Sequence, residues 1–292
     1  RLSARLGRVA AANTHRGNMN ELALFAGAGG GILGGHLLGW RTVCAVERDA
    51  YAASVLAQRQ NDGCLKPFPV WSDVCSFDGR PWRGLVDVVS GGFPCQDISA
   101  AGSGAGIDGE RSGLWREMAR IIGEVRPRFV FVENSPLLVG RGLAVVLGDL
   151  AEMGFDAEWA CVSASDLDAP HQRDRIWLVA YSNGSRQLQQ AGSEQEQRNR
   201  TGYSGEDLAD AHGLGLGLQR LEQKPQPCKH GRPNRLHGGA GSAFGWPDWP
   251  TEPNVGRVAD GVANRMDRVK AIGNGQVPRV AAAAFAMLSK HK

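Results

Sequence analysis

The chain has 292 residues, of which 42% are hydrophobic and 22% are charged, a composition typical of a globular protein with a full core. No apolar run approaches the roughly 18 residues that a membrane span needs, and no secretory signal is recognisable, so we expect a cytoplasmic protein without a membrane partner. The six cysteines are scattered without a C-x-x-C pair, which argues against a metal site. The net charge of +3 is small, but Lys and Arg concentrate in residues 1–18, 220–237 and 257–292.

The apolar pattern from Glu21 onward predicts strands that alternate with helices. The predicted strands are 22–25, 42–46, 85–90, 128–133, 157–163 and 175–181, and the predicted helices are 32–38, 50–60, 113–125, 143–154 and 276–288. Such alternation indicates the α/β class, with a doubly wound, mostly parallel sheet covered on both faces.

Two segments do not fit this pattern. Residues 1–18 precede Met19 without an apolar period, and we expect a leader or flexible N-terminal extension there. Residues 182–254 are rich in Gln, Gly, Ser and Arg, which indicates an inserted surface module or a linker. Residues 19–181 and 255–292 would then form one domain.

A glycine-rich stretch, Phe25-Ala-Gly-Ala-Gly-Gly-Gly31, lies between the first predicted strand and the first predicted helix. Glycine amides there can approach a ligand closely, and the helix N-terminus favours negative charge. Glu47 ends the next predicted strand, about twenty residues on, where an acid can bind a ribose hydroxyl pair. The pattern predicts a nucleotide-like cofactor site, with a glycine-rich turn that binds nothing as the alternative.

Cys95 lies in the stretch Ser90-Gly-Gly-Phe-Pro-Cys-Gln-Asp-Ile-Ser99, directly after a predicted strand. A structural thiol normally lies inside an apolar element, whereas this one follows a proline in a polar loop. The ends of parallel strands are where a doubly wound sheet presents catalytic groups. Cys95 is therefore a candidate nucleophile.

Glu133 follows the apolar run Val130-Phe-Val, so it and Cys95 end two consecutive predicted strands and can face one pocket. Arg173 and Arg175 precede the last predicted strand, and their alternate spacing places both on one side of an extended chain. The alternatives are a helix cap for Glu133 and a surface ion pair for each arginine.

Taken in order, these segments resemble the motifs of DNA (cytosine-5)-methyltransferases of the bacterial and phage type. The motifs are F-x-G-x-G-G, G-F-P-C-Q, E-N after a strand, R-x-R and a late Gly273-Asn274, and the likeness covers about residues 21–181 and 255–288. The resemblance implies the Rossmann-like fold of S-adenosylmethionine-dependent methyltransferases. It also implies a catalytic domain at 19–181 and 255–292 and a small target-recognition region at 182–254.

The resemblance further implies a role for each matching residue. Cys95 is the expected nucleophile on a cytosine flipped out of the duplex, Glu133 grips cytosine N3, and Arg173 and Arg175 lie beside the base and the thiol. The residues expected to bind S-adenosylmethionine are Phe25, Gly27, Ala28, Gly30, Glu47, Asp73, Val74, Pro94 and Asn274.

The partner implied is double-stranded DNA. The residues expected to contact it are Gln96 and Ser99 on a loop that closes over the base, and the basic side chains Arg220, Lys224, Lys229, Arg232 and Arg235 of the insert. For any single basic residue, a solvated linker position is the alternative. We expect a monomer that needs no metal, beside a restriction endonuclease that acts separately.

Three positions depart from the usual residues of the family. His171 stands where Gln is usual, Ser135 where Val is usual, and Gln276 where Val is common. These departures bear on subgroup and fine cofactor contacts. The alternatives left open are an RNA cytosine-5 methyltransferase of the same fold and a catalytically silent DNA-binding relative. An enzyme acting on an exocyclic nitrogen is disfavoured, because its Asp/Asn-Pro-Pro-aromatic tetrapeptide is absent from the sequence.

Overall fold

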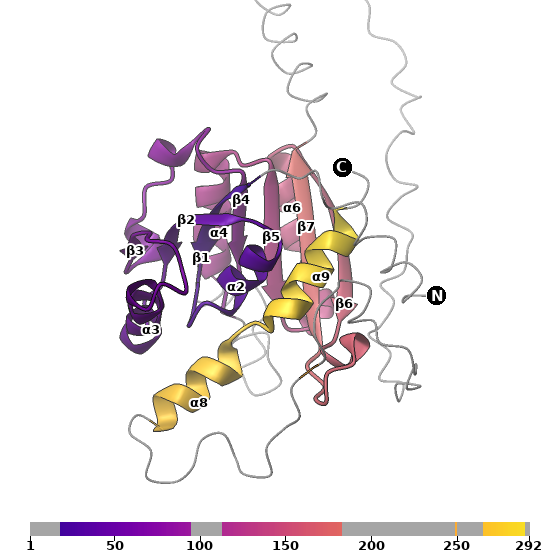
Figure 1. Cartoon of the computed structure of the whole chain (residues 1–292). Helices are drawn as coiled ribbons and strands as arrows, with labels where there is room; N and C mark the ends of the chain where they lie inside the picture. Colours follow the sequence, from indigo (N-terminus) through magenta and orange to yellow (C-terminus); the bar gives the residue numbers. More distant parts are fainter. Residues whose placement is uncertain (1–17, 95–112, 183–248, 250–264, 290–292) are drawn as a thin grey trace, which may run out of the picture. The chain divides into compact units, whose positions relative to one another are not determined.

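The computed structural model describes residues 18–94, 113–182, 249 and 265–289. These residues form a seven-stranded sheet in the order β3-β2-β1-β4-β5-β7-β6 (Figure 1). The strands are β1 (Asn20–Leu24), β2 (Arg41–Val46), β3 (Val70–Trp71), β4 (Val88–Gly91), β5 (Phe129–Asn134), β6 (Phe155–Val162) and β7 (Arg175–Ser182).

The direction of the strands decides which residues share an edge of the sheet. β1, β2, β3, β4 and β5 pair in parallel, and β7 runs antiparallel to both β5 and β6. The predicted mostly parallel sheet is therefore confirmed. Because β7 runs in the opposite direction, its first residue, Arg175, lies at the edge where β5 ends, and Glu133 pairs with Trp177 across the two strands.

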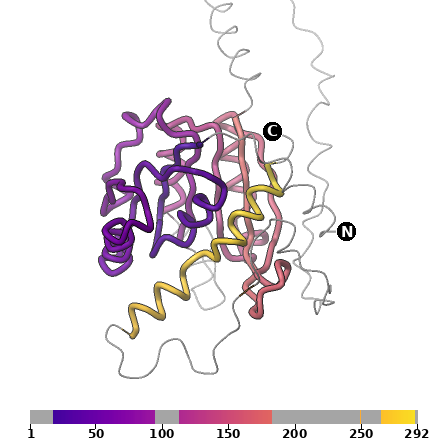
Figure 2. The backbone as a smooth tube through the Cα atoms, in the orientation of Figure 1, coloured from indigo at the N-terminus to yellow at the C-terminus, as the bar shows by residue number. Residues whose placement is uncertain are grey.

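Helices cover both faces of the sheet, as the alternating pattern predicted. Residues that alternate along the strands point to opposite faces: Val89 and Val130 pack on one side, and Val88 and Phe131 on the other. The first face is covered by α4 (Gly113–Val125) and α6 (Leu143–Glu152), and the second by α2 (Gly30–Leu37), α3 (Ala50–Asn61) and α9 (Pro278–Leu288). Figure 2 shows α9 crossing the second face at the end of the chain.

Short elements complete the described residues. They are α5 (Leu138–Arg141), α8 (Arg265–Asn274) and the 3-10 helices η2 (Val74–Ser76), η3 (Arg80–Trp82) and η5 (Ser165–Leu167). Trp249 fixes one further point of the chain, because its indole N–H donates to the backbone oxygen of Leu167 at 2.6 Å and its ring lies under the Arg279 guanidinium at 4.7 Å.

Several predicted boundaries were wrong. The strand predicted from Leu85 begins at Val88, because Leu85 is 60% exposed and its N–H donates to Trp82 in a turn. The helix predicted from Gln276 begins at Pro278, and proline is well suited to the first helical turn. The sequence did not predict β3, α5 or α8. The proposed extension and insert lie mostly outside the described residues.

Candidate active site

The loop between β1 and α2 is shaped by glycines and by Glu47. Gly27 and Gly29 have φ of +55° and +91°, and Phe25 adopts φ +51° although it is not glycine. The N–H of Gly27 donates to Glu47 Oε2 at 2.6 Å, and the N–H of Asp49 donates to Glu47 Oε1 at 2.6 Å. The predicted cofactor residues Phe25, Gly27 and Glu47 therefore lie together at the carboxyl edge of the sheet.

The start of α2 lies directly against the segment before α9. A Cβ atom at Gly30 would lie 2.2 Å from the backbone oxygen of Gln276, and one at Gly31 would lie 2.6 Å from Gln276 Oε1. Glycine is required at position 30, where the obstacle is backbone, whereas at position 31 the Gln276 side chain would have to move. The late segment thereby closes over the start of α2, and Asn274 reaches the same cavity as the glycine loop.

The predicted cofactor residues Asp73 and Val74 lie just after β3. The N–H of Glu47 donates to the backbone oxygen of Trp71 at 2.8 Å, so this segment begins beside the end of β2. Asp73 Oδ1 accepts a hydrogen bond from the N–H of Cys75 at 3.0 Å and caps η2. Val74 is buried, and Asp73 remains half-buried at the edge of the sheet.

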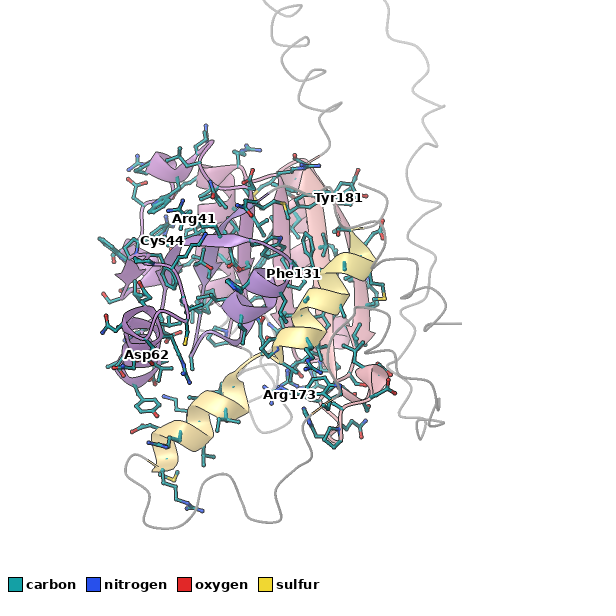
Figure 3. The ribbon with its side chains drawn as sticks, viewed as in Figure 1. Arg41, Cys44, Asp62, Phe131, Arg173 and Tyr181 are labelled. Atoms are coloured by element: carbon teal, nitrogen blue, oxygen red, sulfur yellow. The ribbon has the colours of Figure 1, made fainter. Side chains whose placement is uncertain are left out.

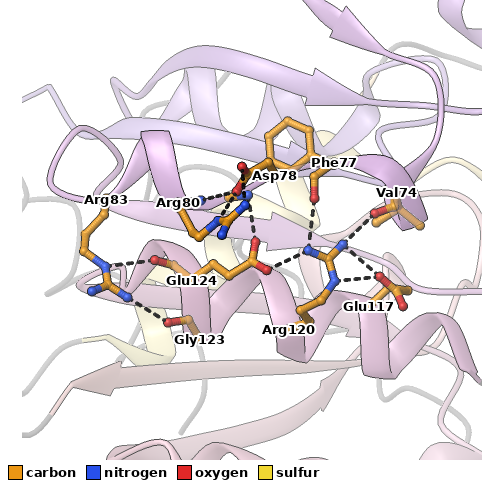
Figure 4. Close-up of polar contacts among 10 residues, drawn as sticks. Val74, Phe77, Asp78, Arg80, Arg83, Glu117, Arg120, Gly123 and Glu124 are labelled. Atoms are coloured by element: carbon orange, nitrogen blue, oxygen red, sulfur yellow. Dashed lines mark hydrogen bonds and ion pairs between the residues drawn. The ribbon is translucent and has the colours of Figure 1, made fainter.

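Arg120 of α4 holds this segment in place (Figure 4). Its guanidinium donates to the backbone oxygens of Val74 and Phe77, both at 3.0 Å. Glu117 and Glu124 fix the guanidinium through ion pairs of 2.8 Å each. Arg120 was not predicted as a site residue, since helical spacing alone explains its ion pairs with the two acids.

The ends of β4 and β5 are joined by side-chain contacts. Asn134 is buried, and its Nδ2 donates to the backbone oxygen of Phe93 at 3.1 Å. A Cβ atom at Gly92 would lie 2.6 Å from Glu133 Oε2, so glycine lets the loop pass against the carboxylate. Pro94 is the last described residue of this loop. The path of the chain toward Cys95 thus starts beside Glu133.

Glu133 is 9% exposed and pairs with Arg175, whose Nε lies 2.7 Å from Glu133 Oε1. Burial raises the pKa of Glu133 above its ordinary value. The positive charges of Arg175 and Arg173 and a hydrogen bond with the Gln276 side chain offset only part of this effect. The carboxyl of Glu133 is therefore easier to protonate than that of an exposed glutamate.

Arg173 connects the segment before β7 with the late segment of the chain. Its Nη2 donates to the backbone oxygen of Gly273 at 2.7 Å and also to that of Gly275. Figure 3 shows Arg173 beside the junction of α8 and α9. Its Nε is buried and has no hydrogen-bond partner among the described residues. Burial and the nearby charge of Arg175 lower the pKa of Arg173.

A cavity at the carboxyl edge brings several of these groups together. Its lining includes Phe25, Gly27, Ser90, Glu133, Asn274 and Gln276. Other predicted site residues do not line it: Ala28, Gly30, Glu47, Asp73, Val74, Pro94, Arg173 and Arg175. Ser90 and Gln276 were not predicted as site residues. The signal available in the sequence was their nearness to a motif, because Ser90 lies just before G-F-P-C-Q and Gln276 lies just after Gly273-Asn274.

Some predicted residues lie outside the described part of the chain: Cys95, Gln96, Ser99, Arg220, Lys224, Lys229, Arg232 and Arg235.

A second cavity, of about 220 Å³ and lined in part by His36, Arg41 and Lys66, lies at the opposite edge of the sheet and holds none of the predicted site residues. In the described ranges, no group of three His, Cys, Asp or Glu side chains could hold a metal ion, and no helix is long and apolar enough to cross a membrane.

The arrangement of strands and helices is similar to that of a solved structure. The solved structure of the Entamoeba histolytica methyltransferase EhMeth matches with a TM-score of 0.58, over 95% of this chain and 100% of that one. The sequences are 13% identical, so the likeness concerns the fold alone.

Residues 19–224 match the family described as C-5 cytosine-specific DNA methylase. This range holds the glycine loop, Cys95, Glu133, Arg173 and Arg175 and is more than half of the chain, so the chain belongs to this family. Membership implies a methyl donor.

Two relatives illustrate the extent of the similarity. Type II methyltransferase M.Eco47II of Escherichia coli is 34% identical over 171 residues, which are 56% of this chain and 39% of that protein. Type II methyltransferase M.PspPI of a Psychrobacter species is 35% identical over 162 residues, which are 53% of this chain and 38% of that protein. The chain thus matches less than half the length of these relatives.

Proposed function

We propose that the chain transfers a methyl group from S-adenosylmethionine to C5 of a cytosine in DNA. The observation that carries the proposal is that Glu133, paired with Arg175, lines one cavity with the β1–α2 loop, in a member of the C-5 cytosine-specific DNA methylase family. A carboxyl group able to act on the base and a loop able to hold the donor share this cavity. Donor and acceptor can therefore meet.

The residues around the glycine loop fit S-adenosylmethionine. Glu47 is held by two backbone N–H groups at the end of β2, where a carboxylate can accept from ribose hydroxyls. Asp73 offers a carboxylate for the adenine amino group, and Asn274 approaches from the late segment. The remaining proposed contacts are Phe25, Gly27, Ala28, Gly30, Val74 and Pro94. Bound S-adenosylmethionine supplies an electrophilic methyl group and leaves as S-adenosylhomocysteine.

The chemical difficulty is that C5 of cytosine is a weak nucleophile, and a covalent step overcomes it. The Cys95 thiolate forms a bond to C6 while Glu133 donates to N3, so that the displaced electron pair gathers at C5. C5 then bonds to the methyl group. Water takes the C5 proton, and the C–H electron pair re-forms the C5–C6 double bond, which expels the Cys95 thiolate. N3 returns its proton to Glu133, and the ring is restored.

Glu133 and the two arginines have the properties that these steps need. The raised pKa of Glu133 favours a protonated carboxyl that can donate to N3. We propose that the positive charges of Arg173 and Arg175 stabilise a thiolate at Cys95, which follows in sequence the loop whose Gly92 lies against Glu133. The acid and the nucleophile would thus be supported by the same two guanidinium groups.

Access to the base requires that the cytosine be flipped out of the duplex, at a cost of a few kcal/mol. Residues 19–181 and 255–292 would form the catalytic domain and residues 182–254 the target-recognition region. The proposed DNA contacts are Gln96, Ser99, Arg220, Lys224, Lys229, Arg232 and Arg235. We further propose a cytoplasmic monomer, with a separate restriction endonuclease recognising the same site.

The test is methyl transfer from labelled S-adenosylmethionine to mixed-sequence duplex DNA, followed by bisulfite mapping of the methylated positions. We expect 5-methylcytosine at a fixed sequence and none with the Cys95→Ala variant. Cys64→Ala is the matched control, because Cys64 is an exposed cysteine that does not line the cavity. This control should retain the activity.

Other outcomes would contradict the proposal in identifiable ways. Transfer to RNA and not to DNA would assign the chain to RNA modification. Binding of S-adenosylmethionine without transfer to either nucleic acid would indicate a silent DNA-binding relative. Activity that survives in Cys95→Ala would reject the covalent step.

A further inference from the structure

Gln276 stands where the family commonly has Val, and its side chain lies in the proposed catalytic cavity. It follows the Gly273-Asn274 motif and precedes α9, so its backbone is fixed on both sides. The backbone oxygen of Gln276 lies against Gly30, which leaves the side chain little freedom to point elsewhere. The departure from Val therefore places an amide inside the site.

The amide of Gln276 lies between the cofactor loop and the catalytic acid. Its Oε1 would be 2.6 Å from a Cβ at Gly31, on the side of α2. Its Nε2 lies 3.3 Å from the Cβ position of Gly92, and Glu133 Oε2 lies 2.6 Å from the same point. Gln276 Nε2 and Glu133 Oε2 thus face the same point in the cavity, and the Gln276 side chain acts as a hydrogen-bonding group that lowers the pKa of Glu133.

The two oxygens of Glu133 therefore have different partners. Arg175 Nε binds Oε1 at 2.7 Å, whereas Oε2 faces the point beside Gly92 that the Gln276 amide also faces. We propose that Gln276 is a positioning residue for Glu133, which orients the carboxyl toward N3 of the cytosine and sets its protonation. This inference rests on the proposed function of Glu133, and it assigns to this chain a contact that Val cannot make.

An amide is suited to this role in both protonation states of the acid. The N–H of Gln276 can donate to an ionised Glu133, and its oxygen can accept from a protonated one after the amide rotates. The charged groups that face Glu133 in the described residues are Arg173 and Arg175. Removing the amide leaves these charges in place, so its effect can be measured separately.

The test compares Gln276→Val with the wild type by carbon-13 NMR of the glutamate carboxyl groups, with the Glu133 signal assigned through Glu133→Gln. We expect the midpoint of the Glu133 titration to rise by about one pH unit in Gln276→Val, because a donor to the ionised form is lost. In methyl transfer, kcat should fall about tenfold with KM for S-adenosylmethionine little changed, and the alkaline limb of the pH profile should move upward.

Gln58→Val is the matched control, because Gln58 also donates an amide hydrogen bond to a carboxylate, Asp62 Oδ1 at 2.7 Å, but on the exposed side of α3. It should change neither the titration nor kcat. An unchanged midpoint of the Glu133 titration in Gln276→Val would overturn the inference. A fall of kcat and KM by the same factor, with no shift of the pH profile, would also overturn it. The NMR titration needs no substrate, so it remains decisive even if the wild type does not methylate DNA.

Discussion

Replacing Glu21 by Gln is expected to remove a pH dependence from the stability of the protein. Glu21 lies in β1 and is 1% exposed, and its carboxyl accepts from Ser90 Oγ at 2.6 Å and from Thr42 Oγ1 at 2.7 Å. Burial raises its pKa from 4.5 to about 7, although the two hydroxyl donors act in the opposite direction. The folded protein therefore keeps a proton that the unfolded chain releases at lower pH.

The size of the effect follows from the two pKa values. Each pKa unit corresponds to about 1.4 kcal/mol, so a rise from 4.5 to about 7 corresponds to roughly 3 kcal/mol. Below pH 4.5 both states hold the proton, and the contribution of Glu21 to the free energy of unfolding is fully present. As the pH rises toward 7 the unfolded chain ionises first, and the contribution is lost.

The assay is urea denaturation followed by tryptophan fluorescence between pH 4.5 and pH 8, a range that spans both pKa values of Glu21. The free energy of unfolding of the wild type minus that of Glu21→Gln should fall by about 3 kcal/mol across this range. The control is Glu152→Gln, at an exposed position of α6. Parallel curves for the wild type and Glu21→Gln would refute the reasoning.

Two further substitutions test the packing around the proposed cofactor site. Gly30→Ala should destabilise the fold by about 1–3 kcal/mol, because the new Cβ would meet the backbone oxygen of Gln276. Gly148→Ala should instead raise the midpoint of thermal unfolding, because its Cβ meets nothing within 4 Å inside α6. A lower midpoint for Gly148→Ala would contradict this expectation. Arg120→Gln should weaken binding of S-adenosylhomocysteine severalfold in calorimetry, because η2 loses two backbone contacts, and unchanged affinity would mean that η2 does not contact the ligand.

The sequence was sufficient to predict the central strands and the acid at their edge. β5 is an apolar run that is buried along its whole length, and such a run can be recognised without knowledge of its neighbours. Glu133 was identified because a carboxylate interrupts this pattern at the end of the strand. That interpretation needed the local sequence and the position of Cys95 after the preceding predicted strand.

Features that depend on distant residues could not be predicted. The helix α8 exposes Met266, Val269 and Ile272. It therefore has no buried apolar face, which is the feature from which a helix is predicted. Gln276 was predicted as the first residue of the last helix, whereas it precedes α9 and lines the cavity. The contact of Arg173 with Gly273 joins residues far apart in sequence, and spacing gives no indication of it.

The contacts of Arg173 with Gly273 and Gly275, and of Gln276 with Gly30, have a consequence for the order in which the protein is made. Every strand of the described sheet is synthesised before residues 183–248 leave the ribosome, yet the wall of the cavity formed by residues 274–276 is synthesised after them. A nascent chain can therefore complete its sheet while the pocket is still open on one side. Binding of the methyl donor becomes a property of the finished chain.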